Sequence, residues 1–194
     1  MVEKHIDIAI RIFHWCFVSL LICLFVSISL LDNEELHIFF GYLMLSFVVS
    51  RILWGFLKKG KGDSWGQYLH TPKEVFQYLS GLFKKNTNRI MQIPNPAGSY
   101  MAITMITLFV FISITGLVLE ATFEFSGIAL LIADNVSYNT AYLVEEVHIY
   151  AAYLIIGLSV IHIAGVVYSS KLYGINLPLA IITGRIKPFR RNYD

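Results

Sequence analysis

Four of the six histidines in this 194-residue chain fall inside or at the edges of long apolar segments. They are His14, His37, His148 and His162, and the last two share one apolar run, fourteen residues apart. On a helix, fourteen residues return to within about 40° of the starting direction and rise roughly 21 Å. Because a bilayer's hydrocarbon core is about 30 Å thick, two such imidazoles would share one helix face, one near each side. Buried imidazole needs a partner and is a common metal ligand, so this pattern predicts a ligand at both levels.

The composition indicates a membrane protein. Hydrophobic residues make up 56% of the chain and charged residues 14%, and the mean hydropathy of +0.64 is too high for a soluble domain of this size. Four segments are long and apolar enough to span a bilayer, roughly 9–31, 36–57, 99–121 and 144–169. We therefore expect an all-α membrane protein, a bundle of four transmembrane helices that forms a single domain over residues 1–194.

The charges of the connecting segments predict the orientation. The first and third connections carry carboxylates and no base, whereas the 58–98 connection and the C-terminal tail carry most of the lysines and arginines. By the positive-inside rule, we expect both termini and the 58–98 connection in the cytoplasm. The outer side then presents eight carboxylates and no lysine or arginine: Asp32, Glu34, Glu35, Glu120, Glu124, Asp134, Glu145 and Glu146.

The helix directions pair the four histidines by depth. The first span would run outward with His14 in its inner part, and the second would run inward with His37 at its outer end. The fourth span also runs inward, first past His148 and then past His162. Depth therefore pairs His14 with His162 and His37 with His148.

A b-type haem suits two facing imidazoles better than a bare metal ion. Zinc normally takes four ligands, and no cysteine or carboxylate lies at the right depth to complete its shell. A macrocycle that supplies four nitrogens needs only two axial ligands, so we expect one non-covalent haem b (iron protoporphyrin IX) at each level. The absence of a CxxCH motif argues against covalent haem. The alternative is that these histidines only pack or form hydrogen bonds, for example in a colourless transporter.

Glycines near the histidines could admit the haem. Gly41 lies one turn after His37, Gly165 lies three residues after His162, and Gly116 falls in the third span. Glycine permits close approach to a ring face or edge. Small residues are also common at contacts between membrane helices, which is the alternative explanation for all three.

Two arginines could meet a haem propionate. Arg51 lies fourteen residues after His37 on the same helix face, which places it near the level of the inner haem. It could pair with a propionate there or extend to the cytoplasmic interface, and both roles can hold together. Arg11 is a weaker candidate for the same role.

The cytoplasmic connection should contain a short amphipathic helix. Thr71-Pro72-Lys73-Glu74 has the form of a capping box with proline at the first helical position. One apolar stripe follows, formed by Val75, Phe76, Leu79, Leu82 and Phe83. We expect a helix on the inner membrane surface that connects the second and third spans, with a partner site as the alternative. Asn95-Pro96 predicts a cap and a first-turn proline for the third span.

Several motifs resemble one known family. In chain order they are RIFHW (11–15), HIFFGY (37–42), RILWG (51–55), NPAGSY (95–100), ITG (114–116), VHIYAAYLIIGLSVIHIAGV (147–166) and ITGRIK (182–187). They resemble the bacterial cytochrome b561 family, which includes the b-type cytochrome subunits of nickel–iron hydrogenases. The resemblance implies four core transmembrane helices, two haems b and electron exchange between the quinone pool and a partner at the outer face. It matches the family's haem ligands to His14, His37, His148 and His162.

The resemblance also implies a location in the cytoplasmic (inner) membrane of a bacterium, and we therefore expect electron transfer across that membrane through two bis-histidine haems b. The expected partners are lipid, quinone or quinol, and a periplasmic redox protein such as a c-type cytochrome, with no nucleic acid. One alternative is a haem-bearing anchor subunit of a hydrogenase or similar complex, although the apolar run 177–182 is too short to be an additional span. Another is superoxide:quinone oxidoreductase activity, which the acidic outer face disfavours because superoxide is an anion. Trp15, Trp54 and Tyr168 are candidates for quinone contact, and an interfacial aromatic belt explains them as well.

Overall fold

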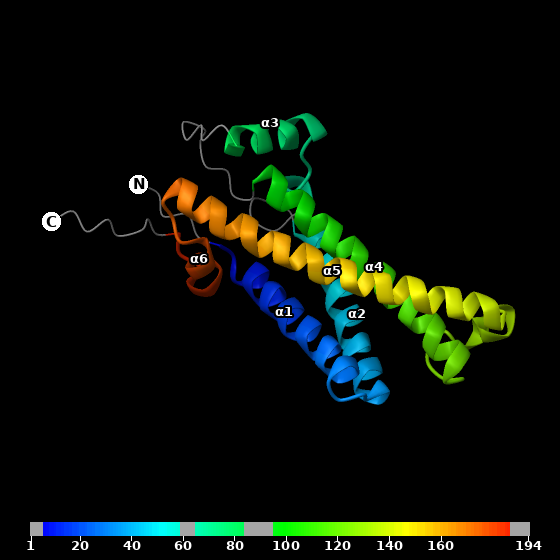
Figure 1. The fold of residues 1–194 in the computed structure, drawn as a ribbon. Helices are drawn as coiled ribbons and strands as arrows, with labels where there is room; N and C mark the ends of the chain where they lie inside the picture. The colour runs from blue at the N-terminus through cyan, green and yellow to red at the C-terminus, as the bar shows by residue number, and fades with distance from the viewer. Residues whose placement is uncertain (1–5, 59–64, 84–94, 187–194) are drawn as a thin grey trace. The chain divides into compact units, whose positions relative to one another are not determined.

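The computed structural model describes residues 6–58, 65–83 and 95–186 (Figure 1). Its elements in these ranges are helices. They are α1 (Ile8–Ser29), α2 (Glu34–Leu57), a 3₁₀ turn (Trp65–Gln67), α3 (Pro72–Phe83), α4 (Pro96–Phe123), a second 3₁₀ turn (Leu130–Asn135), α5 (Tyr138–Tyr173) and α6 (Leu177–Thr183). Four of them, α1, α2, α4 and α5, are long and apolar enough to cross a membrane. The all-α class and the four predicted spans are confirmed.

Local capping determines where several helices begin and end. The Asn33 side chain accepts the Leu36 amide at 2.9 Å at the start of α2, and Asn95 accepts the Gly98 amide at 2.7 Å at the start of α4. The cap predicted at Asn95 is therefore present. Helix α5 is longer than the apolar run 144–169 at both ends. Its first turn is capped by Ser137, and it ends where Gly174 takes a left-handed conformation at φ 65°.

The chain divides into two compact units. Unit 1 comprises residues 1–14, 53–103 and 158–194, and unit 2 comprises residues 15–52 and 104–157. Each of the four long helices contributes residues to both units. The two units are therefore not separate stretches of the chain.

Unit 2 has an apolar core, formed by residues of all four long helices. Its buried members are Leu20, Met44, Val48, Phe109 and Ile155. The rings of Phe17 and Phe109 stack at 5.6 Å between centroids, which adds an aromatic contact between α1 and α4.

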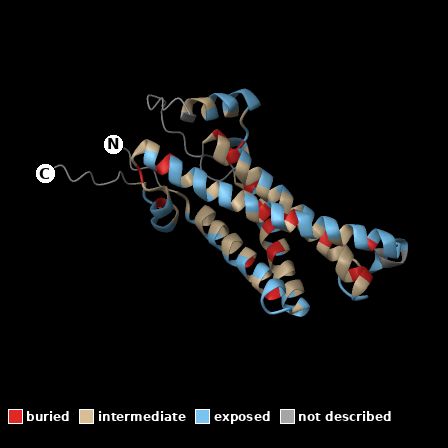
Figure 2. Ribbon diagram, in the orientation of Figure 1, coloured by how far each residue is buried: buried red, intermediate tan, exposed pale blue. Residues whose placement is uncertain are grey.

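Large apolar side chains cover much of the helix surface. Figure 2 shows long exposed stretches on the helices and few buried residues. The exposed side chains include Phe25, Val49, Phe111, Leu154 and Val160. In water this surface would be unfavourable, whereas membrane-spanning helices need an apolar exterior toward the lipid tails.

In unit 1, α6 is attached to the beginning of α1. The Ile6 amide donates to the Gly184 carbonyl at 2.9 Å. The Arg11 guanidinium donates to two carbonyls in the last turn of α6, those of Ile181 and Ile182. A cation at a helix C-terminus is favourable because the last carbonyls lack helical partners and carry partial negative charge. Glycine suits position 184 because φ is 79° there, and a Cβ at this position would lie 2.7 Å from Arg11 Nη1, so the Arg11 side chain would have to shift.

Replacing Arg11 with methionine should loosen α6. The variant loses charge-assisted hydrogen bonds to two carbonyls, so we expect the free energy of local opening of α6 to fall by about 1–3 kcal/mol. Hydrogen exchange of the Gly184 amide, which donates to Ala180 in α6, measures this opening. Arg185→Met is the control because Arg185 is exposed. Equal exchange in both variants would show that Arg11 does not hold α6.

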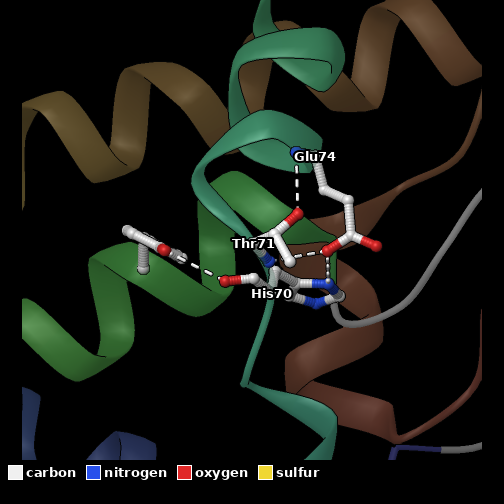
Figure 3. Close-up of polar contacts among 4 residues, drawn as sticks. His70, Thr71 and Glu74 are labelled. Carbon is white, nitrogen blue, oxygen red and sulfur yellow. Dashed lines mark hydrogen bonds and ion pairs between the residues drawn. The ribbon is translucent and has the colours of Figure 1, made fainter.

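The predicted amphipathic helix and its capping box are present. The Thr71 amide donates to Glu74 Oε2 at 2.7 Å, and the Glu74 amide donates to Thr71 Oγ1 at 3.3 Å (Figure 3). The hydrogen bond from the Thr71 backbone holds the pKa of Glu74 below its ordinary value. Tyr100 in α4 donates to the His70 carbonyl at 3.0 Å, which anchors the start of α3. Phe76, in the apolar stripe of α3, is 73% exposed, as a helix face that contacts lipid requires. The location of α3 on the inner membrane surface stays a prediction.

Candidate functional site

The structure brings the four histidines together in the two pairs that depth predicted. In unit 2, His37 of α2 faces His148 of α5, with ring centroids 6.2 Å apart and ring planes at 75°. In unit 1, His14 of α1 faces His162 of α5, with centroids 6.4 Å apart and planes at 52°. All four side chains are half-buried. Helix α5 supplies one histidine to each pair.

The separation within each pair fits one metal between two imidazoles. A metal–imidazole bond is about 2 Å long, so two rings bound on opposite sides of one metal have centroids about 6.3 Å apart. Rings joined by a direct N–H···N hydrogen bond would lie closer, with centroids about 5 Å apart. The observed 6.2 and 6.4 Å agree with the first arrangement.

The donor set of each pair suits a macrocycle. Within residues 6–58, 65–83 and 95–186, no cluster of three or more His, Cys, Asp or Glu could hold a metal ion. Two imidazoles alone do not complete the shell of zinc, which takes four ligands. They do supply the two axial ligands that a porphyrin iron requires. The residues present therefore fit haem, and their role as ligands stays a prediction.

Each histidine of the pair in unit 2 has an oxygen partner on the ring nitrogen Nδ1. His37 Nδ1 lies 3.1 Å from the Leu24 carbonyl oxygen in α1 and 3.5 Å from Ser27 Oγ. His148 Nδ1 lies 2.8 Å from Thr115 Oγ1 in α4. Both rings are thus tied to a neighbouring helix through Nδ1. Sequence patterns did not indicate these partners, although Thr115 directly precedes the glycine of the ITG motif.

The three glycines differ in what surrounds them. A Cβ on Gly116 would lie 3.3 Å from His148 Cε1, so Gly116 makes room for this imidazole. No atom of the described residues comes within 4 Å of a Cβ built on Gly41 or Gly165. A Cβ built on Gly157 would likewise have no neighbour within 4 Å, so free space beside a glycine does not by itself identify a contact with haem. The expected contact of Gly41, Gly116 and Gly165 with a porphyrin stays a prediction.

The two arginines lie in different units. Arg51 belongs to unit 2 and is only 5% exposed, so its guanidinium lies within the protein and does not extend to solvent. Arg11 belongs to unit 1 and binds the last turn of α6, a role that no sequence pattern indicated. The propionate contacts expected of Arg51 and Arg11 stay predictions.

Carboxylates flank the histidine pair of unit 2. Exposed Glu34 and Glu35 precede His37 by two or three residues, and Glu145 and Glu146 precede His148 by the same interval. Because the two rings face each other, both acidic segments belong to the surroundings of this pair. Unit 2 as a whole has eight carboxylates against a single arginine, whereas the other fourteen lysines and arginines belong to unit 1.

One of these carboxylates, that of Glu120, is hydrogen-bonded within unit 2. Glu120 Oε2 accepts the Tyr42 hydroxyl at 2.6 Å, and the Tyr42 oxygen accepts the Ile128 amide at 3.3 Å. Gly127 has φ 86°, and a Cβ there would meet the Glu120 carboxylate. Half-buried Glu120 therefore links α4 to α2 through Tyr42, and the Tyr42 oxygen in turn holds the segment after α4. Among the described outer carboxylates, the exposed ones are Asp32, Glu34, Glu35, Glu124 and Glu146.

The family described as prokaryotic cytochrome b561 matches the chain over residues 5–184. This range begins before α1 and reaches the residue that ends α6, so it includes all four histidines of the two pairs. No curated protein and no solved structure shows a significant match.

Proposed function

Since the chain belongs to the prokaryotic cytochrome b561 family and is thus a membrane-bound, electron-transferring cytochrome b, we propose that it works through two bis-histidine haems. One haem b is held by His14 and His162, and the other by His37 and His148. Electrons pass between the quinone pool and a redox protein at the periplasmic face, such as a c-type cytochrome.

The spacing of the two histidine pairs carries this proposal. Each pair has the ring separation of two ligands on one metal and no third protein donor of the kind that zinc requires, within the described residues. When bound, each haem would supply a one-electron centre whose potential depends on ligation, burial and nearby charge. The protein's part is to hold the ligands, to keep water away and to set the local charge.

The sequence spacing of the two histidines of α5 supports a path across the membrane. His148 and His162 are fourteen residues apart, which on a helix corresponds to a rise of about 21 Å. This is most of the thickness of the hydrocarbon core, about 30 Å. An electron path of two haems supported by α5 would therefore cover most of the bilayer.

The distribution of charge supports the proposed orientation and partner. The basic residues of unit 1 favour the cytoplasmic side of the inner membrane for both termini, by the positive-inside rule. The carboxylates of unit 2 would then face the periplasm, where they attract a basic redox protein and repel anions such as superoxide. The same charges make superoxide oxidation a poorer candidate than exchange with a basic cytochrome.

A haem count tests the proposal directly. We expect the purified protein to show a reduced-minus-oxidised b-type spectrum and two haems b per chain in the pyridine haemochrome assay. The ferric protein should give low-spin signals, because both axial positions of each iron are filled by imidazole. A haem count other than two per chain would contradict the assignment of two histidine pairs.

A further inference from the structure

We propose that Thr115 is a positioning residue for His148. Its hydroxyl accepts the Nδ1 proton of this imidazole, selects the tautomer that can bind iron through Nε2, and lowers the reduction potential of the haem held by His37 and His148. The inference rests on the proposed function, because it assigns a role toward a haem.

The hydrogen-bond directions follow from the oxygen partners. Thr115 is 8% exposed, and its Oγ1 donates to the Ile112 carbonyl at 2.9 Å within α4. A hydroxyl has one proton, which this bond uses. At 2.8 Å from His148 Nδ1, the Thr115 oxygen can therefore only accept, so the proton of the neutral ring is on Nδ1.

The opposite ring is held in the same state. The Leu24 carbonyl, 3.1 Å from His37 Nδ1, has no proton to give, so His37 also donates from Nδ1. In both neutral imidazoles Nε2 then carries the lone pair that a metal needs. Two different helices, α1 and α4, thus prepare the two ligands of one pair.

The hydrogen bond also affects the electronic state of the ligand. An imidazole that donates its second N–H to an oxygen is a more basic ligand and favours ferric over ferrous iron. Thr115 and Gly116 act on the same ring, since a Cβ on Gly116 would lie 3.3 Å from His148 Cε1. The ring is therefore fixed both by a polar contact and by the narrow space beside it.

The test replaces Thr115 with valine, which keeps the branched shape and removes the oxygen. Thr122→Val is a matched control, because Thr122 is in the same helix, is also 8% exposed, and donates to the Val118 carbonyl of its own helix. Thr115→Ser retains the hydroxyl. The measurements are the haem count, a potentiometric titration that resolves both haems, and the low-spin ferric EPR spectrum.

In Thr115→Val we expect the reduction potential of one of the two haems to rise and the EPR signal of that haem to shift. The potential and the EPR signal of the other haem should not change. Thr122→Val and Thr115→Ser should match the wild type. Loss of one haem from Thr115→Val, with both retained in Thr115→Ser, supports the same conclusion. If Thr115→Val does not fold, Thr115→Ala removes the same oxygen and is measured in the same way, and unchanged haem potentials and EPR signals in that variant overturn the inference.

The inference is overturned if Thr115→Val keeps two haems with wild-type potentials and EPR signals. It is also overturned if Thr122→Val produces the same shift as Thr115→Val. A wild-type protein without two haems b would instead overturn the proposed function, so the two failures are distinguishable.

Discussion

Replacing His162 with alanine should reduce the haem content from two haems b per chain to one and abolish electron transfer across the membrane. The remaining imidazole, His14, cannot fill both axial positions of one iron, so this site without its second ligand should bind haem poorly. The other pair, His37 and His148, lies wholly in unit 2 and should keep its haem. The measurements are the pyridine haemochrome count and the rate at which quinol reduces an outer acceptor.

The four single alanine variants should fall into two classes. Those at His14 and His162 should share one residual spectrum, and those at His37 and His148 should share another. His70→Ala is the control, since His70 precedes α3 and belongs to neither pair. The assignment would be wrong if any of the four variants kept both haems with unchanged six-coordinate low-spin signals, or if the classes grouped differently.

Neutralising Glu34, Glu35 and Glu146 together should slow electron exchange with a basic soluble c-type cytochrome by about tenfold at low ionic strength. All three are exposed carboxylates of unit 2, and they lie two or three residues before the histidines of one pair. Each glutamine replacement removes one attractive charge and keeps the side-chain shape. The second-order rate constant, measured over a range of salt concentrations, tests this expectation.

Salt provides an independent check on the same prediction. Exposed charges are screened beyond about 10 Å at 0.1 M salt, so the wild-type rate should fall with ionic strength and the triple variant should depend on it less. Glu74→Gln is the matched control, because Glu74 is an exposed carboxylate of unit 1. A wild-type rate that does not depend on salt would show that docking is not electrostatic, whatever the haem content.

The helices and the histidine pairs could be predicted because the thickness of a bilayer sets the length of an apolar span, and the position of a residue along a span then gives its depth in the membrane. A span must be apolar over the hydrocarbon thickness, so hydropathy alone locates α1, α2, α4 and α5. Alternating directions then assign a depth to each residue, which was enough to pair His14 with His162 and His37 with His148. The capping box of α3 was also predictable, because its residues are neighbours in the chain and act locally.

Helix ends were less predictable from hydropathy. The apolar run marks the part of a helix that lies in lipid, whereas the helix itself continues until a cap ends it. Helix α5 therefore extends from Tyr138 to Tyr173, between Ser137 and Gly174, beyond both limits of its apolar run.

Hydrogen-bond partners between helices depended on the tertiary structure alone. Apolar periodicity determines depth and roughly which face is buried, but a hydrogen bond requires both atoms to lie within a few tenths of an ångström and a narrow angle. Residue type alone does not distinguish Thr115, which meets His148, from Thr122, which donates to the Val118 carbonyl within α4. Arg11 likewise binds carbonyls 170 and 171 residues away, a pairing that arises only when the two ends of the chain meet.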